Sequence, residues 1–404
     1  MVPKGWSQKL ISDVGAVVTG NTPPTSNPEY YNGKYPFVSP ADLGAHKLIN
    51  SSIKSLSSQG MEKARSVRAG ATLFTCIGST IGKIGLAGCT LATNQQINVV
   101  IPKPDYDDDY VYYQLELRAA YIAKLAGTQA VPIINKTTFE SQCIWVPDSL
   151  PEQKKIAKIL STWDRVISTT EQLLANSQQQ KKALMQQLLT GKKRLRDNKG
   201  VRFCGEWKLD KLSKIFERVT TKNDGKSTNV VTISGQQGLI RQEDFFKKSV
   251  ASDILDGYFL LMKGQFAYNK SYSNGYPMGA IKRLNRYADG VVTTLYICFE
   301  ISESTKANGD FWEHYFESGL LNKGLSQIAH EGGRAHGLLN VKPTDFFSLK
   351  VPLPSLDEQQ KIATVLTVAD REITILQQKL ATLKQEKQAL MQQLLTGKRR
   401  VKIN

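Results

Sequence analysis

Residues that build metal centres, disulfide frameworks and acid–base sites are scarce in this sequence. Its 404 residues include five cysteines, none of them in a C-x-x-C pair, and four histidines. No histidine stands near a cysteine at the spacing of a zinc site, so we expect no metal ion in this chain. An odd set of scattered cysteines is typical of a reducing compartment, which predicts a cytoplasmic protein.

Long apolar runs and acidic residues are also in short supply. The first residues, MVPKGWSQKL, hold no apolar signal region, and no later stretch is long enough to span a bilayer, so we expect no membrane association. The acidic residues number 36 against 53 Lys and Arg, which gives a net charge of +17. Such an excess is typical of proteins that bind a polyanion, although a basic solvated surface would give the same count.

Three short stretches approach catalytic motifs, and each departs from its motif. GSTIGK (78–83) has one residue too few between its glycines for a phosphate loop and lacks the following Ser or Thr. NPEY (27–30) has Glu29 where an amino-methyltransferase motif has its second proline, and no glycine-rich cofactor loop precedes it. PDSLPEQK (147–154) spaces its acidic residues too tightly for a nuclease motif. The chain therefore looks like a binding protein rather than a catalyst.

An internal repeat organises the chain. LPEQKKIAKIL (150–160) aligns with LDEQQKIATVL (356–366), and ALMQQLLTGK occurs unchanged at 183–192 and 389–398, all at one offset of 206 residues. The segments between these copies share only short borders. The sequence thus predicts two globular segments that alternate with two similar helices. We expect these parts at 1–148 (domain), 149–192 (helix), 193–205 (linker), 206–354 (domain), 355–398 (helix) and 399–404 (basic tail).

Each repeat carries the signals of a helix start and a helix end. Ser149 and Ser355 stand three residues before Glu152 and Glu358, the spacing of a capping box in which Ser accepts a first-turn N–H and Glu reaches back. Each copy ends in a glycine followed by a Lys/Arg cluster, which suits a helix C-terminus.

A heptad pattern runs between these signals in both copies. Its apolar 4/3 spacing predicts that the two helices pair as a coiled coil, antiparallel if a pseudo-two-fold axis relates them. Lys181 and Lys387 occupy the same position in each copy, where a polar residue can fix the register. An ordinary amphipathic helix on each domain would show a similar pattern. The seam residues are Leu160, Trp163, Ile167, Thr170, Leu174, Ser177, Lys181, Leu184 and Leu188, then Leu366, Ala369, Ile373, Leu376, Leu380, Leu383, Lys387, Leu390 and Leu394.

Short alternating strands and one helix are expected in each globular segment, which makes the fold class α+β. The expected strands and helix cover 70–78, 83–88, 96–102 and 110–126 in the first segment, and 229–235, 264–270, 290–301 and 310–329 in the second. Their loops are rich in Asn, Gln, Ser, Thr, Lys and Arg, which suit base edges and phosphates. Ordinary loop polarity explains the same composition.

The full pattern resembles the DNA specificity subunit of a type I restriction–modification system, over essentially all 404 residues. The two helical repeats carry the resemblance. The stretches GNTPPTSNPEYYNGKYPFVSPADL (20–43), ATNQQIN (92–98) and YNKSYSNGYPMGAIKRL (268–284) are similar to target-recognition domains of that family.

The resemblance implies a non-catalytic subunit that binds double-stranded DNA. Each recognition domain would read one half of a bipartite, asymmetric site through the major groove, and the helices would set the unread spacer like a ruler. Cofactors would lie on partners rather than on this chain: S-adenosylmethionine on two modification subunits, and ATP and magnesium on restriction subunits.

Two groups of loop residues are the expected DNA contacts. In the first domain they are Lys83, Asn94, Gln95 and Gln96, and in the second Asn269, Lys270, Ser271, Tyr272, Lys282 and Arg283. A structural turn is the alternative explanation for Asn94 and Gln95. Two alternative functions also stay open, namely a self-contained methyltransferase or nuclease with a fused specificity region, and a DNA-binding scaffold outside restriction.

Overall fold

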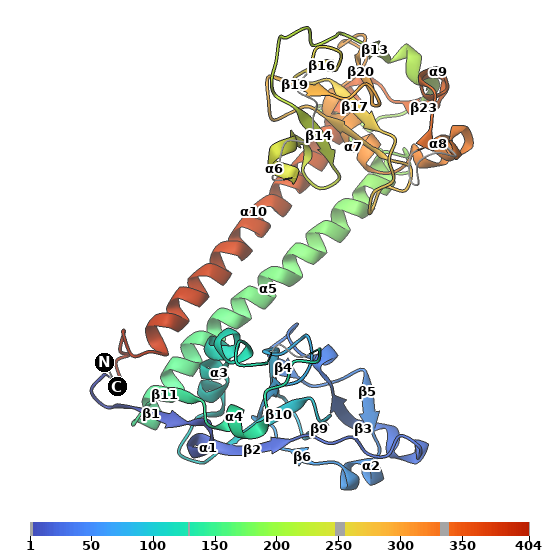
Figure 1. The fold of residues 1–404 in the computed structure, drawn as a ribbon. Coiled ribbons are helices and arrows are strands. Elements are labelled where there is room, and N and C mark those ends of the chain that lie inside the picture. Colours follow the sequence, from blue (N-terminus) through green and yellow to red (C-terminus); the bar gives the residue numbers. More distant parts are fainter. Residues whose placement is uncertain (1–2, 128–129, 247–254, 332–338, 404) are drawn as a thin grey trace. The chain divides into compact units, whose positions relative to one another are not determined.

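The computed structural model describes residues 3–127, 130–246, 255–331 and 339–403 (Figure 1). The chain divides into two compact units. Unit 1 comprises Met1–Gln172 with Gln378–Asn404, and unit 2 comprises Leu173–Gln377. Two long helices, α5 (Leu150–Leu188) and α10 (Leu356–Leu394), contribute one part to each unit. Each unit therefore combines one globular domain with segments of both long helices. The domain boundaries expected from the sequence follow the order of the chain, and they stay a prediction.

Unit 1 is built on two sheets that share one core. Five strands lie in the order β2-β10-β7-β8-β4 and four in the order β5-β3-β9-β6, while β1 pairs with β11. The strands are β1 (Trp6–Leu10), β2 (Gly15–Thr19), β3 (Tyr31–Val38), β4 (Leu48–Ile49), β5 (Lys54–Leu56), β6 (Ser66–Val67), β7 (Thr72–Thr75), β8 (Ile84–Ala87), β9 (Leu91–Thr93), β10 (Ile97–Pro102) and β11 (Cys143–Pro147). The shorter helices are α1 (Ile11–Val14), α2 (Ser58–Lys63), α3 (Asp108–Ala123), α4 (Lys136–Glu140) and the 3-10 turns η1 (Pro28–Tyr30) and η2 (Pro40–Asp42).

Both faces of the central strands β10, β7 and β8 are buried, which explains their nearly continuous apolar sequences. Successive side chains of a strand point to opposite faces. Phe74 and Val100 therefore join α3 in one buried cluster, while their neighbours Leu73 and Val99 join the four-stranded sheet in another.

Unit 2 repeats the central part of this plan. Four strands lie in the order β13-β20-β17-β18, β12 pairs with β23, and three further strand pairs (β14-β15, β16-β19, β21-β22) complete the unit. The strands are β12 (Lys208–Lys211), β13 (Phe216–Val219), β14 (Val231–Ser234), β15 (Gly238–Arg241), β16 (Phe259–Met262), β17 (Phe266–Asn269), β18 (Ala280–Arg283), β19 (Asp289–Val292), β20 (Ile297–Ile301), β21 (His330–Glu331), β22 (Leu339–Asn340) and β23 (Lys350–Leu353). The helices are α6 (Gln242–Phe246), α7 (Gly309–Glu317), α8 (Asn322–Ile328), α9 (Pro343–Ser348) and the 3-10 turn η3 (Leu212–Lys214).

The expected strands and helices are confirmed with two differences. The single strand expected over 290–301 is two strands, β19 and β20, because residues 293–296 form a turn. The single helix expected over 310–329 is α7 followed by α8. Gly319 lies between them with φ +74°, a conformation that favours glycine and ends a helix.

The ends of the long helices follow the sequence signals only in part. Gly191 and Gly397 take φ +69° and +68°, as expected of a residue just after a helix. Ser355 accepts the backbone N–H of Glu358 at 3.4 Å. At the start of α5, the Glu152 N–H instead donates to the Ser149 backbone carbonyl at 3.0 Å. The expected return bond from the glutamate is wrong, because the carboxylates of Glu152 and Glu358 bind arginines.

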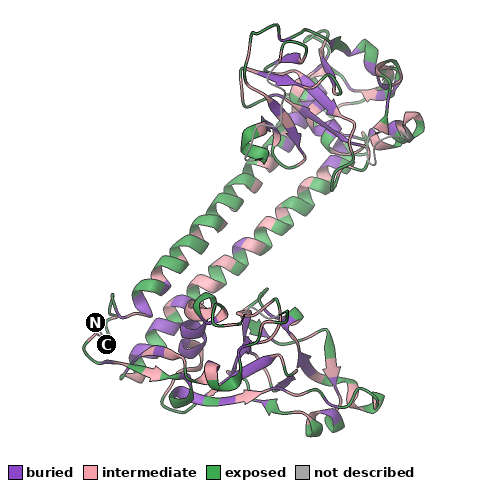
Figure 2. Ribbon diagram, in the orientation of Figure 1, coloured by how far each residue is buried: buried purple, intermediate pink, exposed green. Residues whose placement is uncertain are grey.

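Within each unit the two long helices run antiparallel. In unit 1, Asp164 and Glu171 of α5 pair with Lys387 and Lys384 of α10, so the order along one helix is reversed along the other. In unit 2, Lys181 and Ser177 contact Asp370 and Glu372 in the same reversed manner. All the residues assigned to the seam are buried or half-buried, whereas most of their neighbours are exposed (Figure 2). Among the described residues, no helix has the length and apolar character required to cross a bilayer.

Candidate nucleic-acid interface

Two of the loops chosen from the sequence occupy the same place in the two domains. The strands β2-β10-β7-β8 and β13-β20-β17-β18 have one order and one antiparallel arrangement. The hairpin between β7 and β8 carries Lys83, and the equivalent hairpin between β17 and β18 carries Lys270, Ser271 and Tyr272. The expected contacts thus fall on matching hairpins with different sequences.

The expected contacts of the first domain lie close together. Asn94 accepts the backbone N–H of Gln96 and donates from Nδ2 to the Gln96 side chain, at 3.1 and 2.9 Å. Gln96 also donates to the Ile77 carbonyl in the β7–β8 hairpin at 3.4 Å. Gln95 is exposed and accepts from the Thr22 hydroxyl at 2.7 Å. Asn94 and Gln96 therefore build a turn, and Gln95 is the residue of the three whose side chain faces solvent.

Lys83 stands at the end of the same hairpin. Its Nζ donates to the Pro40 carbonyl at 3.4 Å, and its alkyl chain lies over Gly44. The amine makes no ion pair among the residues that the structure describes.

The contacts expected in the second domain separate into two groups. Asn269 accepts the backbone N–H of Ser271 at 3.1 Å, so it shapes the start of its loop. Tyr272 is 63% exposed. Burial and the nearby charge of Arg218 lower the pKa of Lys270. Lys270, Ser271 and Tyr272 are consecutive residues of the β17–β18 loop.

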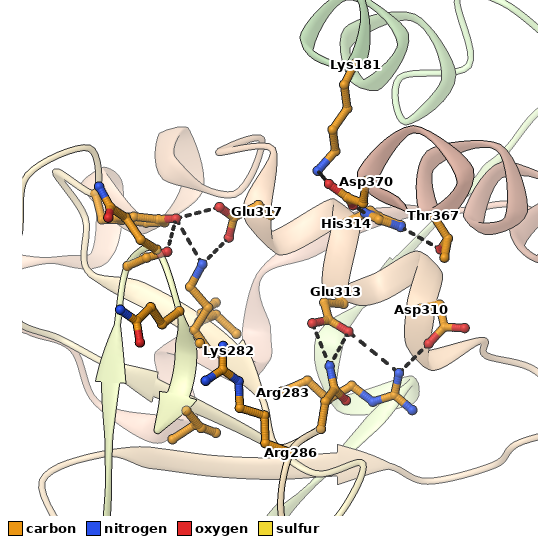
Figure 3. Close-up of a pocket in the computed structure, with 18 of the residues that line it drawn as sticks. Lys181, Lys282, Arg283, Arg286, Asp310, Glu313, His314, Glu317, Thr367 and Asp370 are labelled. Carbon is orange, nitrogen blue, oxygen red and sulfur yellow. Dashed lines mark hydrogen bonds and ion pairs between the residues drawn. The ribbon is translucent and has the colours of Figure 1, made fainter. Parts of the chain in front are cut away.

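Lys282 and Arg283 belong to the second group and bind acidic residues within the domain (Figure 3). The Lys282 amine contacts the Glu317 carboxylate and donates to the Tyr276 hydroxyl at 2.9 Å. The Arg283 guanidinium donates to Asp310 at 2.5 Å. Both side chains fix β18 to α7, which leaves them poorly placed for a phosphate.

The groove beside these residues holds charges of both signs. It has a volume of about 870 Å³ and lies in unit 2 between β18, α7 and the helix pair, with Lys181, Arg286, Glu313 and Asp370 on its walls. A groove of about 710 Å³ occupies the corresponding place in unit 1. Because acidic side chains line both grooves, neither is an electrostatic match for DNA by itself.

One ion pair in each unit joins the two long helices, and the two ion pairs use equivalent residues; we name them the anchor pairs. Lys181 Nζ lies 2.5 Å from Asp370 in unit 2, and Lys387 Nζ lies 2.6 Å from Asp164 in unit 1. The members of one pair stand 206 residues from those of the other. These lysines were expected to fix the register, and the structure gives each a carboxylate on the opposite helix.

Each anchor pair also touches the domain helix of its unit. In unit 1, Tyr113 of α3 donates to Asp164 at 2.5 Å, and Glu116 contacts Lys387 at 3.1 Å. Burial alone would lower the pKa of Lys387, but the charges of Glu116 and Asp164 raise it. In unit 2, His314 of α7 takes the place of the tyrosine, with Nδ1 3.7 Å from Asp370. Burial lowers the pKa of His314.

A second pair of equivalent contacts fixes the helix starts. Arg400 donates twice to Glu152 in unit 1, at 2.7 and 2.8 Å, and Arg194 donates twice to Glu358 in unit 2, at 2.6 and 2.7 Å. Trp207 Nε1 adds a third hydrogen bond to Glu358 at 2.9 Å. Sequence reasoning missed these pairs. The signal was present, because both members of each pair recur at the repeat offset.

The first turn of each long helix also positions a domain helix. Gln153 of α5 accepts the backbone N–H of Asp107, the residue that caps α3, at 2.9 Å. Gln359 of α10 accepts the N–H of Asn308, which caps α7, also at 2.9 Å. A glutamine at the same position of each repeat thus docks a domain helix, although the two domains differ in sequence.

No group of three His, Cys, Asp or Glu side chains suited to a metal ion occurs among the described residues.

Comparison with known proteins gives one family for both halves of the chain. The model of the type I restriction modification DNA specificity domain matches residues 3–176 and again residues 212–385. The MjaVIII specificity subunit of a type I restriction enzyme from Methanocaldococcus jannaschii is 26% identical over 99% of this chain and 94% of its own length. The HindI specificity subunit from Haemophilus influenzae is 31% identical over 45% of this chain and 39% of its own length.

Solved structures share the fold. The S subunit of a type I restriction–modification system from M. genitalium matches with a TM-score of 0.58 and 15% identity, covering 98% of this chain and 99% of that chain. A second solved chain, from a structure that describes complex assembly and conformational transition of the type I restriction–modification system, matches with a TM-score of 0.57 and 14% identity. The match covers 98% of each chain.

Proposed function

The chain belongs to the family of type I restriction–modification DNA specificity subunits, and from that premise we propose that it selects a bipartite DNA site for partner enzymes. It carries out no chemical step itself. Each domain reads one half of the site in the major groove, and modification and restriction partners methylate or cleave the DNA.

One observation carries this proposal. The two domains share a four-stranded sheet in one order, yet their equivalent hairpins read CIGSTIGK (76–83) and KSYSNGYPMG (270–279). Equal scaffolds with unequal loops are suited to bind two different half-sites in related orientations. The site is therefore asymmetric.

The repeats support two docking positions for one kind of partner. ALMQQLLTGK ends both long helices, and Ala183, Gln186 and Gln187 are exposed just as Ala389, Gln392 and Gln393 are. Two identical surface segments fit two copies of the modification subunit, one on each unit. We expect S-adenosylmethionine on those subunits and ATP and magnesium on the restriction subunits, and we propose that the complex acts on DNA in the cytoplasm.

The spacer prediction rests on helix length. Each long helix has 39 residues, which at 1.5 Å per residue extends about 58 Å. A continuous helix is stiff enough to hold a fixed length, so we propose that α5 and α10 together set the unread spacer.

The test compares the chain alone with the assembled complex. Purified chain incubated with S-adenosylmethionine and DNA should transfer no methyl group, and addition of the modification subunits should start methylation at one bipartite site. Methylation by the chain alone would refute the proposal.

A further inference from the structure

A turn that the sequence did not single out matches the expected contact turn of the first domain. Before β10, the Ile97 N–H donates to the Asn94 carbonyl at 3.2 Å, and the Gln96 N–H donates to the Asn94 side chain at 3.1 Å. Before β20, the Tyr296 N–H donates to the Thr293 carbonyl at 3.2 Å. The Leu295 N–H donates to the Thr293 hydroxyl at 3.3 Å. The two turns therefore have the same hydrogen bonds at the start of equivalent strands.

The position of this turn beside the hairpin follows from strand register. In unit 1, the Cys76 N–H of the β7–β8 hairpin donates to the Gln96 carbonyl at 2.8 Å, which joins the turn to the hairpin. In unit 2, Tyr268 of β17 pairs with Ile297 of β20. Continuing that antiparallel register brings the loop after Asn269 alongside the turn that precedes Ile297.

The exposed side chains of the two turns differ in chemistry. Gln95 faces solvent in the first domain, whereas Thr294 and Leu295 are exposed in the second, Leu295 by 60%. An exposed leucine at the tip of a polar turn gains no burial within its own domain. Leucine and threonine methyl groups are suited to the C5-methyl group of thymine in the major groove.

We propose that the turn Thr293–Tyr296 determines base specificity in the second domain, where Thr294 and Leu295 contact base edges. This inference rests on the proposed function, because it assumes that the second domain reads one half-site. The base contacts are thus assigned to this turn and not to Lys282 and Arg283, which bind Glu317 and Asp310 within the domain.

The experiment uses the complete chain in complex with its modification subunits and a pool of duplex DNA of random sequence. Duplexes retained by the wild-type complex are sequenced, and base preference is determined at every position. Leu295→Ala should reduce discrimination at one or two positions of a single half-site by about 5-fold to 150-fold, the effect of losing one direct base contact. The other half-site should keep its preferences.

Leu209→Ala is the matched control, because Leu209 lies in the same unit and is 69% exposed. It should select the wild-type motif. Since both leucines are exposed, neither variant is expected to alter folding, which circular dichroism checks. A wild-type motif from Leu295→Ala, or equal weakening of both half-sites, would overturn the inference while leaving the proposed function intact. A wild-type complex that selects no bipartite motif would overturn both.

Discussion

Arg194 holds Glu358 with two hydrogen bonds across 164 positions of the chain, from Nε to Oε1 at 2.6 Å and from Nη2 to Oε2 at 2.7 Å. The carboxylate is almost fully buried, with 1% of its side chain exposed. A buried carboxylate is tolerated only when it is paired and hydrogen-bonded. The end of one long helix therefore depends on the start of the other within unit 2.

Removal of this arginine should destabilise unit 2. Arg194→Ala leaves the Glu358 charge buried with Trp207 as its remaining side-chain donor, which is expected to lower the free energy of unfolding by about 3–5 kcal/mol. Urea unfolding followed by tryptophan fluorescence measures the change. Arg196→Ala, which removes an exposed arginine two residues away that donates to the Gly200 carbonyl, is the control and should cost under about 0.5 kcal/mol. Equal effects of the two variants would contradict the role of the buried pair.

His314 should make unit 2 sensitive to acid. Burial lowers its pKa in the folded state, whereas the unfolded side chain keeps a pKa of about 6.5. As pH falls below about 6.5, the unfolded chain therefore binds the proton first, and stability is lost. The nearby charges of Asp370, Asp310 and Glu317 favour protonation of the ring, and the charge of Lys181 opposes it.

Urea unfolding at pH 5.5 and pH 7.5 tests this expectation. His314→Gln keeps a polar side chain there without titrating, so its stability should change less between the two pH values than that of the wild type. Equal pH dependence in both proteins would show that His314 does not titrate on unfolding.

Lys282 should matter for stability and not for DNA choice. Its side chain is 11% exposed and pairs with Glu317, so Lys282→Met should lower the free energy of unfolding by about 1–3 kcal/mol with an unchanged selected motif. Lys263→Met, at an exposed position of the same unit, should leave both properties unchanged. A Lys282→Met complex that selects different bases would restore this lysine to the interface.

Helix length should set the length of the unread spacer. One heptad inserted at equivalent positions of α5 and α10 keeps the seam in register and adds about 10.5 Å of helix, which corresponds to about three base pairs. Seven Gly and Ser residues inserted in the linker 193–205 serve as the control and should leave the spacer unchanged. A spacer that stays constant in both variants, read from the methylated motif, would refute the ruler.

The sequence predicted the two repeated helices and the strands with alternating apolar residues. The 206-residue offset predicted both long helices and placed Lys181 and Lys387 on the seam, because helix period and capping are local properties. It assigned Glu152 and Glu358 to the helix caps, because spacing alone does not show that a distant arginine reaches them.

The loop contacts were harder to choose for the same reason. Lys282 and Arg283 look like free cations in KRLNR (282–286), and only the packing of α7 against β18 pairs them with Glu317 and Asp310. The turn at Thr293 was hidden inside one expected strand, because its residues favour strands and no glycine or proline marks the break.

The most direct test of two domains reading one bipartite site is methylome sequencing of cells that carry this chain with its modification subunits. The expected result is a single methylated motif with two different defined halves and a fixed undefined spacer, in which exchange of residues 206–354 for those of a relative changes one half alone. A continuous motif, a palindromic motif, or a change in both halves after the exchange would contradict it.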